Sequence, residues 1–333
     1  MDSRIRFAIV GLGFIGKRYA VLIKNNPSAL LTAIVDPHET DVALHDGSIK
    51  RFHDLTELLE SDTPPDVIII ASPNGFHKDQ AIQALNAKKH LIIEKPLALS
   101  LADAETIYSK AKGLNQKVFS VVPNRYSVVS EWLYQLVSSG RLGQLYMVQV
   151  NCFWNRDERY YNNQWRGTAA LDGGPLFTQF YHFVDLLHWL FGDLTNIDSR
   201  FFDFNHQHLT ETEDSGIIRF DFVSGGSGSL NYTTAVKDKN LESSITIIAQ
   251  NGSVKIGGQY MERIEHCDIL GHDLPEAELL AHSSALNNHQ ALFDDIIKTL
   301  RSEEEQKITP EETMKVIEII DKIYSTRSIT KSL

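Results

Sequence analysis

The run "FAIVGLGFIG", residues 7–16, constrains the fold of this chain more than any other stretch. Phe7 to Val10 predict an apolar strand, and the glycine-rich turn after it leads into an amphipathic helical pattern through Ile23. This is G-x-G-x-x-G between a strand and a helix, the context in which the motif binds a dinucleotide. The first glycine permits the turn, the second admits a pyrophosphate, and the third lets helix and strand pack closely. The predicted phosphate-binding residues, at the positive end of the helix, are Gly11, Gly13, Phe14, Ile15 and Gly16.

A second apolar run, "LLTAIVD", ends in Asp36, 20 residues after Gly16. An acidic residue at about this spacing hydrogen-bonds the ribose hydroxyls of the bound adenosine. Its negative charge would repel a 2′-phosphate, so the sequence favours NAD over NADP. The alternative is an ordinary strand–turn–helix with a loop aspartate, and the combination of motif and spacing makes it the weaker interpretation.

Strands and helices go on alternating to about residue 124, which predicts an α/β fold with a doubly wound parallel sheet. Ligands of such sheets bind beyond the carboxyl ends of the strands. We therefore expect a cofactor cleft lined by residues at or just beyond these strand ends. They are Ser72, Pro73, Asn74, His77, Lys95 and Asn124.

The predicted strand at 90–93 runs directly into Glu94, Lys95 and Pro96. A buried charge without a partner costs several kcal/mol, so Lys95 either escapes to solvent or is held in a cleft. The strand-end position favours the cleft. Successive side chains of a strand point to opposite faces, so Glu94 and Lys95 need not pair with each other. The sequence leaves open whether the Lys95–Pro96 bond is cis.

After residue 123 the pattern changes to long strand-like runs separated by turn signals such as "SGGSGS" and "QNGS". These runs predict a mostly antiparallel sheet. We therefore predict an NAD-binding domain at 1–122 and a substrate-binding and oligomerisation domain at 123–333. The C-terminal run "ETMKVIEIIDKIYSTRS" predicts a helix, which could pack back on the first domain.

The chain has 32 Lys and Arg against 43 Asp and Glu, a net charge of −11. This acidity argues against nucleic acid or an anionic membrane as a partner. No run reaches the roughly 18 apolar residues of a bilayer span, and "MDSRIRFAIVG" lacks the apolar region of a signal peptide. We expect a cytoplasmic protein. Its two cysteines, Cys152 and Cys267, predict neither a disulfide framework nor a zinc site, and we expect both to be reduced and buried.

The stretch "FWNRDERYYNNQWRGTAALDGG" concentrates arginines and aromatic residues in an otherwise acidic chain. The residues concerned are Arg156, Arg159, Tyr160, Tyr161, Trp165 and Arg166. Guanidinium forks suit phosphate or carboxylate groups. The other interpretation is a surface loop with ordinary ion pairs.

An apolar helical run follows, with Thr178 four residues before His182 and Asp185 three residues after it, on one helix face. A histidine on an apolar helix is most often a hydrogen-bonded core residue. No set of metal ligands accompanies His182, so the sequence predicts no metal site.

The glycine motif at 11–16, the "EKP" at 94–96 and His182 together resemble the glucose–fructose oxidoreductase / inositol dehydrogenase (Gfo/Idh/MocA) family over nearly the whole chain. The resemblance implies a Rossmann domain followed by an α/β domain with an open sheet, an NAD cofactor, and a homo-oligomer (dimer or tetramer) formed through that sheet. It implies that Lys95 and His182 are the catalytic groups. It adds Glu94, Trp165 and Arg166 to the cofactor site.

A narrower resemblance rests on "VPNRY", "FWNRDERYY" and "WRGTAALDGGPLFTQFYHFVDLLHWLFG". These segments look like the branch that oxidises the 3-hydroxyl of UDP-N-acetylglucosaminuronic acid in surface-polysaccharide sugar synthesis. The implied substrate-binding residues are Lys95, Arg156, Arg159, Tyr160, Tyr161, Arg166, Thr178, Gln179 and His182. Thr178 departs from the aspartate or asparagine of relatives, and Pro175 stands where relatives often have a third glycine.

For such a substrate we favour His182 as the base, because imidazole titrates near neutral pH. Lys95 would stabilise the developing alkoxide. The reverse assignment would need the lysine pKa lowered by about 3 units, and it stays open. An inositol, a free sugar or a trans-dihydrodiol as substrate, and recycling of bound NADH by a 2-oxo acid, also stay open. A non-catalytic NAD sensor is a different class of function, which the presence of both Lys95 and His182 disfavours.

Overall fold

The computed structural model describes residues 4–38, 49–62, 64–259, 261–271 and 285–329. Internal contacts divide the chain into two compact units. The first is Met1–Val121 with Leu292–Met314, and the second is Val122–Ala291 with Lys315–Leu333. The predicted domains at 1–122 and 123–333, and the packing of the C-terminal helix on the first of them, stay predictions.

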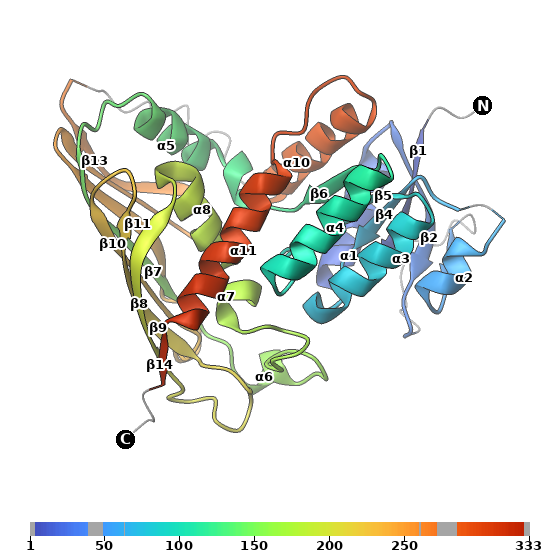
Figure 1. Cartoon of the computed structure of the whole chain (residues 1–333), viewed down its shortest axis with the longest axis horizontal. Coiled ribbons are helices and arrows are strands. Elements are labelled where there is room, and N and C mark those ends of the chain that lie inside the picture. Colours follow the sequence, from blue (N-terminus) through green and yellow to red (C-terminus); the bar gives the residue numbers. More distant parts are fainter. Residues whose placement is uncertain (1–3, 39–48, 63, 260, 272–284, 330–333) are drawn as a thin grey trace. The chain divides into compact units, whose positions relative to one another are not determined.

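The first unit is built on a six-stranded sheet in the order β3-β2-β1-β4-β5-β6 (Figure 1). All its strand pairs are parallel. The strands are β1 (Ile5–Val10), β2 (Ala29–Val35), β3 (Lys50–Phe52), β4 (Val67–Ile70), β5 (His90–Ile93) and β6 (Val118–Ser120). The helices between them are α1 (Phe14–Asn25), α2 (Leu55–Leu59), η1 (Asn74–Phe76), α3 (His77–Asn86) and α4 (Leu101–Gly113). The predicted doubly wound parallel sheet is confirmed, and its order reverses between β1 and β4, where ligands of such sheets bind.

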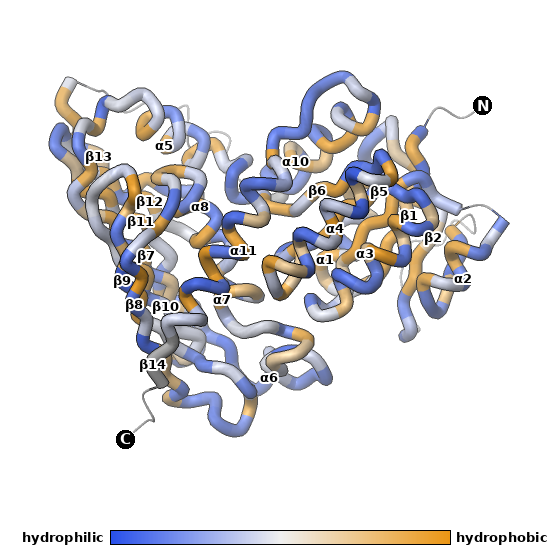
Figure 2. The backbone as a smooth tube through the Cα atoms, viewed as in Figure 1, coloured by the Kyte–Doolittle hydropathy of each residue, from blue (hydrophilic) through white to orange (hydrophobic). Residues whose placement is uncertain are grey.

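Continuous apolar strands form the core of this unit. Every side chain of β4 is fully buried, and Figure 2 shows the strands at the centre of the sheet as strongly hydrophobic. Such runs are expected where helices cover both faces of a parallel sheet. Phe293, from α10 (Ala285–Leu300), packs against Phe7 and Tyr19 with ring centroids 5.5 and 6.4 Å apart. A segment distant in sequence thus completes the core, and the sequence did not predict it.

The second unit contains an eight-stranded sheet in the order β13-β12-β11-β7-β10-β9-β8-β14. Only the pairs β7–β10 and β8–β14 are parallel among the described strands, so the predicted mostly antiparallel sheet is confirmed. The strands are β7 (Leu145–Phe153), β8 (Leu194–Phe202), β9 (Ser215–Phe222), β10 (Ser227–Thr233), β11 (Glu242–Ala249), β12 (Gly252–Gly257), β13 (Arg263–Ile269) and β14 (Arg327–Ile329).

One face of this sheet is packed and the other is open. Helices lie over one face in Figure 1, where α5 and α8 are prominent. The helices and turns of this unit are η2 (Pro123–Tyr126), α5 (Val128–Ser138), α6 (Glu158–Tyr161), α7 (Pro175–Thr178), α8 (Tyr181–Phe191) and, from Lys315 onward, α11 (Pro310–Ser325). Val148 and Val150 of β7 are fully buried, whereas Met147 of the same strand is 58% exposed. This alternation is typical of an antiparallel sheet with one solvated face.

Several elements differ from the sequence-based expectation. The run "KVFSVVPN" at 117–124 is the last strand predicted by the alternating pattern of the first half. The observed strand ends at Ser120, and Pro123 begins η2, as its missing N–H and fixed φ favour. The helical run after Gly174 is two helices, α7 and α8, and residues 327–329 form β14 rather than the end of a helix. The run "GSVKIGGQY" at 252–260 is one of the strand-like runs predicted after residue 123. Its strand ends at Gly257, and Tyr260 lies outside the described residues.

Cys152 is buried on β7, as expected, but Cys267 on the edge strand β13 is only half-buried, so the expectation was wrong for Cys267. None of the helices in the described ranges combines the length and the apolar composition that crossing a bilayer requires.

Candidate active site

The turn after β1 shows why its glycines are needed. Gly11 has a φ of +90°, and a Cβ there would lie 2.7 Å from the Ala71 carbonyl oxygen. A Cβ on Gly16 would lie 2.0 Å from the Gly11 carbonyl oxygen. In contrast, nothing lies within 4 Å of a Cβ built on Gly13. Two glycines are therefore required by the protein's own packing, and Gly13 leaves open space for a ligand.

The N-terminus of α1 fits the pyrophosphate of NAD. The helix begins at Phe14, and the N-cap residue Gly13 provides no side-chain hydrogen bond to the first turn. The first N–H groups of a helix have no intrahelical partner and attract anions. The Phe14 side chain is exposed, and its neighbour Ile15 is half-buried. The open space at Gly13 and the uncapped N–H groups are the observations on which this fit rests.

Asp36 lies at the end of β2 and is tied to the glycine-rich turn. Its Oδ2 accepts a hydrogen bond from the Leu12 N–H at 2.7 Å, and its Oδ1 accepts one from the His38 N–H at 2.9 Å. A carboxylate has about four lone-pair sites, so these two bonds leave acceptor capacity. Recognition of a ribose by Asp36 stays a prediction.

His77 is fully buried, and both of its ring nitrogens face backbone carbonyl oxygens. Nδ1 lies 2.8 Å from the Pro96 oxygen, and Nε2 lies 2.9 Å from the Ser72 oxygen. The ring joins the turn after β4 to the turn after β5, and this geometry does not support a hydrogen bond from it to a cofactor. Burial lowers the pKa of His77, which favours the neutral ring.

Other predicted cofactor residues lie beside this link. The Ser72 hydroxyl donates to Gln80 Oε1 at 2.6 Å. Pro73 is half-buried, and Asn74 is buried at the start of η1. All three follow β4, next to the point where the strand order reverses.

Lys95 follows β5 at the ligand-binding edge of the sheet. Its own N–H donates to Glu94 Oε2 at 3.2 Å, its side chain is half-exposed, and the Lys95–Pro96 bond is cis. Glu94 is buried, and this burial raises the pKa of its carboxyl, although the Lys95 charge acts in the opposite direction. The Lys95 backbone is therefore held by the buried Glu94, and the Lys95 side chain is not fully exposed to solvent.

In the second unit, two arginine guanidiniums lie over the Tyr160 ring. The Arg156 guanidinium lies 5.0 Å from the Tyr160 ring centroid and 4.8 Å from that of Trp154. The Arg166 guanidinium lies 4.2 Å from the Tyr160 centroid and 5.3 Å from that of Trp165. Burial lowers the pKa of Arg156 and raises that of Tyr160. We call Arg156, Tyr160 and Arg166 the arginine–tyrosine stack.

The stack keeps donor groups available. Neither arginine forms an ion pair with a carboxylate in the part of the chain that the structure describes. Arg166 Nε is buried without a hydrogen-bond partner among the described residues. A buried guanidinium donor without an acceptor is costly, so a bound anion would satisfy it.

Gln179, Thr178 and Asp172 hold the stack from the following segment. Arg156 Nε donates to Gln179 Oε1 at 2.7 Å, and Gln179 Nε2 donates to the Tyr160 hydroxyl. The Thr178 hydroxyl donates to the buried Asp172 carboxylate, which also accepts the Gly167 N–H at 2.6 Å. Gln179 therefore contacts the stack directly, whereas Thr178 contacts Asp172, and the roles of both in substrate binding stay predictions.

Arg159 differs from the other two arginines. Its side chain is 83% exposed, and its Nε donates to Asp157 Oδ2 at 2.9 Å. This is the ordinary surface ion pair that was the alternative interpretation of the loop. The grouping of Arg159 with the substrate residues stays a prediction.

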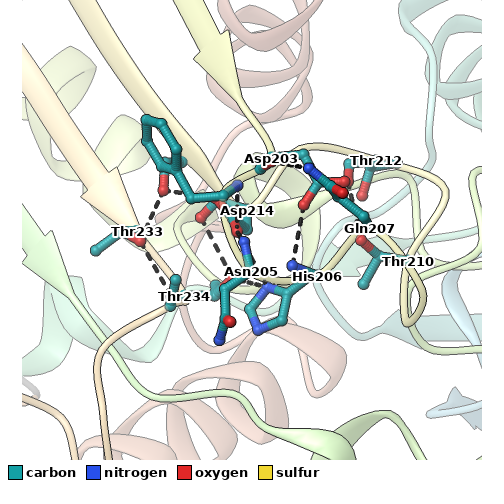
Figure 3. Close-up of polar contacts among 12 residues, drawn as sticks. Asp203, Asn205, His206, Gln207, Thr210, Thr212, Asp214, Thr233 and Thr234 are labelled. Carbon is teal, nitrogen blue, oxygen red and sulfur yellow. Dashed lines mark hydrogen bonds and ion pairs between the residues drawn. The ribbon is translucent and has the colours of Figure 1, made fainter. Parts of the chain in front are cut away.

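Tyr161 packs on a buried polar cluster, which Figure 3 shows around Asp214 and His206. Asp214 Oδ2 accepts the N–H groups of Phe204 and Asn205 at 2.9 and 2.7 Å, and lies 3.7 Å from His206 Nδ1. The His206 ring meets the Tyr161 ring edge-on, with centroids 5.3 Å apart. The cluster anchors the loop after β8, and this loop contacts the arginine-rich segment through the His206 and Tyr161 rings.

His182 lies in the first turn of α8 and is half-buried. One turn on, Asp185 accepts two hydrogen bonds from Arg125 of η2, at 3.0 and 2.8 Å, in a pair whose side chains are at most 5% exposed. Asn124 is buried next to Arg125. Sequence analysis missed this ion pair. Its signal was an aspartate in an apolar helix, which needs a partner when buried.

The candidate residues fall in both units. Lys95 and the predicted phosphate-binding residues belong to the first unit, and His182, Asn124, Trp165 and the arginine–tyrosine stack belong to the second. The catalytic pairing of Lys95 with His182 stays a prediction. Across the described ranges, no cluster of three or more His, Cys, Asp or Glu side chains could hold a metal ion.

Comparison with known proteins identifies the family. Residues 5–121 match the model described as "Oxidoreductase family, NAD-binding Rossmann fold", and residues 131–255 match the "GFO/IDH/MocA C-terminal domain". The chain belongs to the Gfo/Idh/MocA oxidoreductase family. The resemblance predicted from the three motifs is confirmed, and with it the NAD-binding Rossmann fold.

Solved structures resemble the chain over nearly its whole length. The WlbA dehydrogenase from Bordetella pertussis, in complex with NADH and UDP-GlcNAcA, is 29% identical, with a TM-score of 0.91 over 98% of this chain and 96% of that one. The WlbA dehydrogenase from Chromobacterium violaceum, with the same ligands, is 30% identical, with a TM-score of 0.87 over 98% and 94%.

A curated relative matches over a shorter stretch. The glucose-6-phosphate 3-dehydrogenase of Bacillus subtilis is 29% identical over 192 residues, which cover 56% of this chain and 53% of that enzyme. The match thus spans about half the length of this relative.

Proposed function

We propose that this protein is an NAD-dependent dehydrogenase that oxidises the 3-hydroxyl of UDP-N-acetylglucosaminuronic acid. The arginine–tyrosine stack is the observation that carries the choice of substrate. It offers two guanidiniums without carboxylate partners among the described residues, one of them with a buried Nε that lacks an acceptor. A substrate with a diphosphate and a carboxylate supplies the acceptors that such groups bind best.

Further support comes from the two WlbA dehydrogenases, which were crystallised with NADH and UDP-GlcNAcA. Their similarity includes the second unit, where the proposed substrate residues other than Lys95 lie. The proposed role of this enzyme is a step in the synthesis of surface-polysaccharide sugars.

The proposed chemistry uses Lys95 and His182 on the sugar hydroxyl. Bound NAD+ supplies the acceptor for the hydride that leaves the sugar carbon. His182 takes the hydroxyl proton, and the Lys95 ammonium stabilises the negative charge that develops on the oxygen. The products are the 3-keto sugar, NADH and a proton. The exchanged assignment, with Lys95 as base, is tested by the pH dependence of the two single variants.

A phosphorylated or free polyol is the second candidate. It is favoured by the similarity to the glucose-6-phosphate 3-dehydrogenase of Bacillus subtilis. A phosphate monoester would also satisfy the arginine–tyrosine stack, but it lacks the uronic carboxylate. A comparison of charged and uncharged sugars therefore separates the two candidates.

The open face of the eight-stranded sheet is the proposed surface for self-association. It carries the exposed apolar side chains Met147, Ile217 and Ile248, and Met147 of β7 pairs with Ile248 of β11 in the sheet. Sedimentation of the wild-type protein and of Met147→Lys tests this. A monomer in both cases would contradict the proposal.

The substrate proposal is tested by following NADH absorbance with four compounds at equal concentration. These are UDP-N-acetylglucosaminuronic acid, UDP-N-acetylglucosamine, glucose 6-phosphate and myo-inositol. If NADH co-purifies with the protein, a 2-oxo acid is added first to oxidise it. We expect the highest kcat/KM with the uronic acid. A higher value with glucose 6-phosphate or inositol would overturn the proposal, although the assignment to the family would stand.

A further inference from the structure

The two turns that carry Ser72 and Lys95 come from neighbouring strands and are joined by one buried side chain. β4 and β5 pair in parallel, so the residues after each strand emerge at the same edge of the sheet. Between these turns lies His77, which is 0% exposed. It is the first residue of α3, so the helix fixes its backbone.

The His77 ring makes two contacts, both to backbone. Nδ1 contacts the carbonyl oxygen of Pro96, the residue after Lys95, at 2.8 Å. Nε2 contacts the carbonyl oxygen of Ser72 at 2.9 Å. A neutral imidazole donates through one nitrogen, so it bonds one of the two carbonyl oxygens, whereas an imidazolium donates to both. In either form both ring nitrogens lie against the backbone of these turns. No ring nitrogen remains for a ligand.

Lys95 is held from its other side by Glu94. The Glu94 carboxylate is buried and accepts the Lys95 N–H at 3.2 Å. The Lys95 backbone therefore lies between one hydrogen bond at its own nitrogen and one at the carbonyl of the next residue. Main-chain bonds at both sides restrict where the base of the lysine side chain can lie.

We propose that His77 is a positioning residue, which sets the placement of Lys95 through the Pro96 carbonyl rather than by contact with the cofactor. This inference rests on the proposed function, in which Lys95 acts on the substrate hydroxyl. The contact to Ser72 makes the same ring a tie between the cofactor turn and the lysine turn. Displacement of a catalytic group by about 1 Å can cost roughly 100-fold in rate.

Two substitutions separate the two contacts. The amide of His77→Asn lies near the place of Nδ1, so it keeps a donor for Pro96 and loses the contact to Ser72. The amide of His77→Gln reaches the place of Nε2, so it keeps a donor for Ser72 and loses the contact to Pro96. His90→Gln is the matched control. His90 is only partly buried, but it too has a hydrogen bond to backbone, from the Lys117 N–H at 3.0 Å, and it lies at the opposite end of β5.

The experiment measures three quantities for each variant. These are kcat with saturating substrate and NAD+, the Kd of NAD+, and the rate at which an amine-specific acylating reagent labels Lys95 in the NAD+-bound protein, read by peptide mass spectrometry. For His77→Gln we expect kcat to fall roughly 10- to 100-fold and the Lys95 labelling rate to change by about threefold, the effect of half a pKa unit. The Kd of NAD+ should change little. His77→Asn should lose less in kcat, and His90→Gln should change neither kcat nor labelling.

The competing results are distinct. A rise in the Kd of NAD+ with unchanged kcat and labelling would make His77 a cofactor residue and overturn the proposal. Values of kcat and of the Lys95 labelling rate in His77→Gln that match those of His90→Gln would make His77 merely structural and also overturn the proposal. If wild-type protein fails to oxidise UDP-N-acetylglucosaminuronic acid, the proposed function fails, and the Lys95 labelling rate still decides the role of His77.

Discussion

The cofactor edge of the first unit and the arginine-rich segment of the second are built by different means. The cofactor edge uses backbone: a glycine turn, strand ends and uncapped N–H groups at the start of α1. The arginine-rich segment uses side chains from loops, which hold one another across large sequence separations, as Arg156 and Gln179 do. A site built from backbone groups requires fixed spacings in the sequence, whereas a site built from loop side chains does not. The difference explains why the cofactor is easier to predict than the substrate.

The two regions also treat charge differently. At the cofactor edge the buried Glu94 has a raised pKa, because burial disfavours its charged form. In the arginine-rich segment the charges are stacked on aromatic rings, which stabilise cations without a carboxylate. Such a stack needs no carboxylate, so an anionic ligand can bind a guanidinium N–H that lacks an acceptor among the described residues, as Arg166 Nε does. The following predictions test this division of roles, from the largest expected effect to the smallest.

Lys95→Ala should lose catalytic activity but still bind the cofactor. Loss of a group that acts on the reacting oxygen lowers kcat by roughly 10²- to 10⁴-fold. The Kd of NAD+, measured by fluorescence titration, should stay within about threefold because the glycine turn is intact. Lys112→Ala, at an exposed position of α4, is the control and should behave as wild type. Full activity in Lys95→Ala would remove the proposed mechanism.

Arg166→Gln and Arg156→Gln should weaken substrate binding and leave cofactor binding unchanged. A lost hydrogen bond to a charged group costs about 1.5–3 kcal/mol, which is roughly a 10- to 100-fold rise in KM for the UDP-uronic acid. Arg159→Gln is a control within the same segment, because Arg159 is exposed and paired with Asp157. Steady-state kinetics measure all three variants. Equal effects for Arg159 and Arg166 would show that the stack has no special role.

Gly16→Ala should disturb the cofactor edge of the first unit and leave the arginine-rich segment of the second unit unchanged. The added Cβ would meet the Gly11 carbonyl oxygen, and overpacking of this kind costs about 1–3 kcal/mol. We expect the affinity for NAD+ to fall roughly 5- to 100-fold, with a lower melting temperature. Gly113→Ala, where nothing lies within 4 Å of the added Cβ, should keep both quantities unchanged or raise stability slightly. Calorimetric titration with NAD+ compares the two.

Acid should weaken the first unit through its buried histidine. Burial lowers the pKa of His77 below its usual value of 6.5, with the Lys95 charge acting in the same direction and the hydrogen bonds of Pro96 and Ser72 opposing it. The folded state then binds fewer protons than the unfolded state, so this contribution to stability is complete above about pH 6.5 and is lost as the pH falls. Urea unfolding from about pH 7.5 to about 5.5 should show a smaller loss of stability in His77→Gln than in wild type.

Glu94 acts in the opposite direction in that experiment. Its pKa is raised above the usual 4.5, so the folded state holds its proton more tightly and gains stability as the pH falls. Both proteins contain Glu94, so the difference in stability between His77→Gln and wild type does not include the Glu94 contribution. An identical pH slope in the two proteins would contradict the contribution assigned to His77.

The sequence predicted the first unit well because its signals are local. The strand, glycine turn and helix at 7–23 follow one another without a gap, and Asp36 follows at the expected spacing. The sequence did not predict that residues 292–314 belong to this unit, since the packing of Phe293 on Phe7 depends on a contact nearly 300 residues apart. It also gave no sign that His77 uses both ring nitrogens on backbone.

The candidate substrate residues were found by composition rather than by geometry. The density of arginine and aromatic residues marked the segment, but it could not separate the stacked Arg156 and Arg166 from the ion-paired Arg159. The Arg125–Asp185 pair was missed because its partners are 60 residues apart and carry no spacing signal. Cross-loop contacts of this kind depend on the folded sheet that brings the loops together.

The most direct measurement uses UDP-N-acetylglucosaminuronic acid that carries deuterium at C3. The protein is mixed with NAD+ and this substrate, and the NADH formed is analysed by mass spectrometry. We predict that the deuterium appears in the reduced nicotinamide, because the hydride leaves from C3. Unlabelled NADH would place the oxidation at another carbon. No NADH, with NAD+ binding intact and after treatment with a 2-oxo acid, would contradict the proposed substrate altogether.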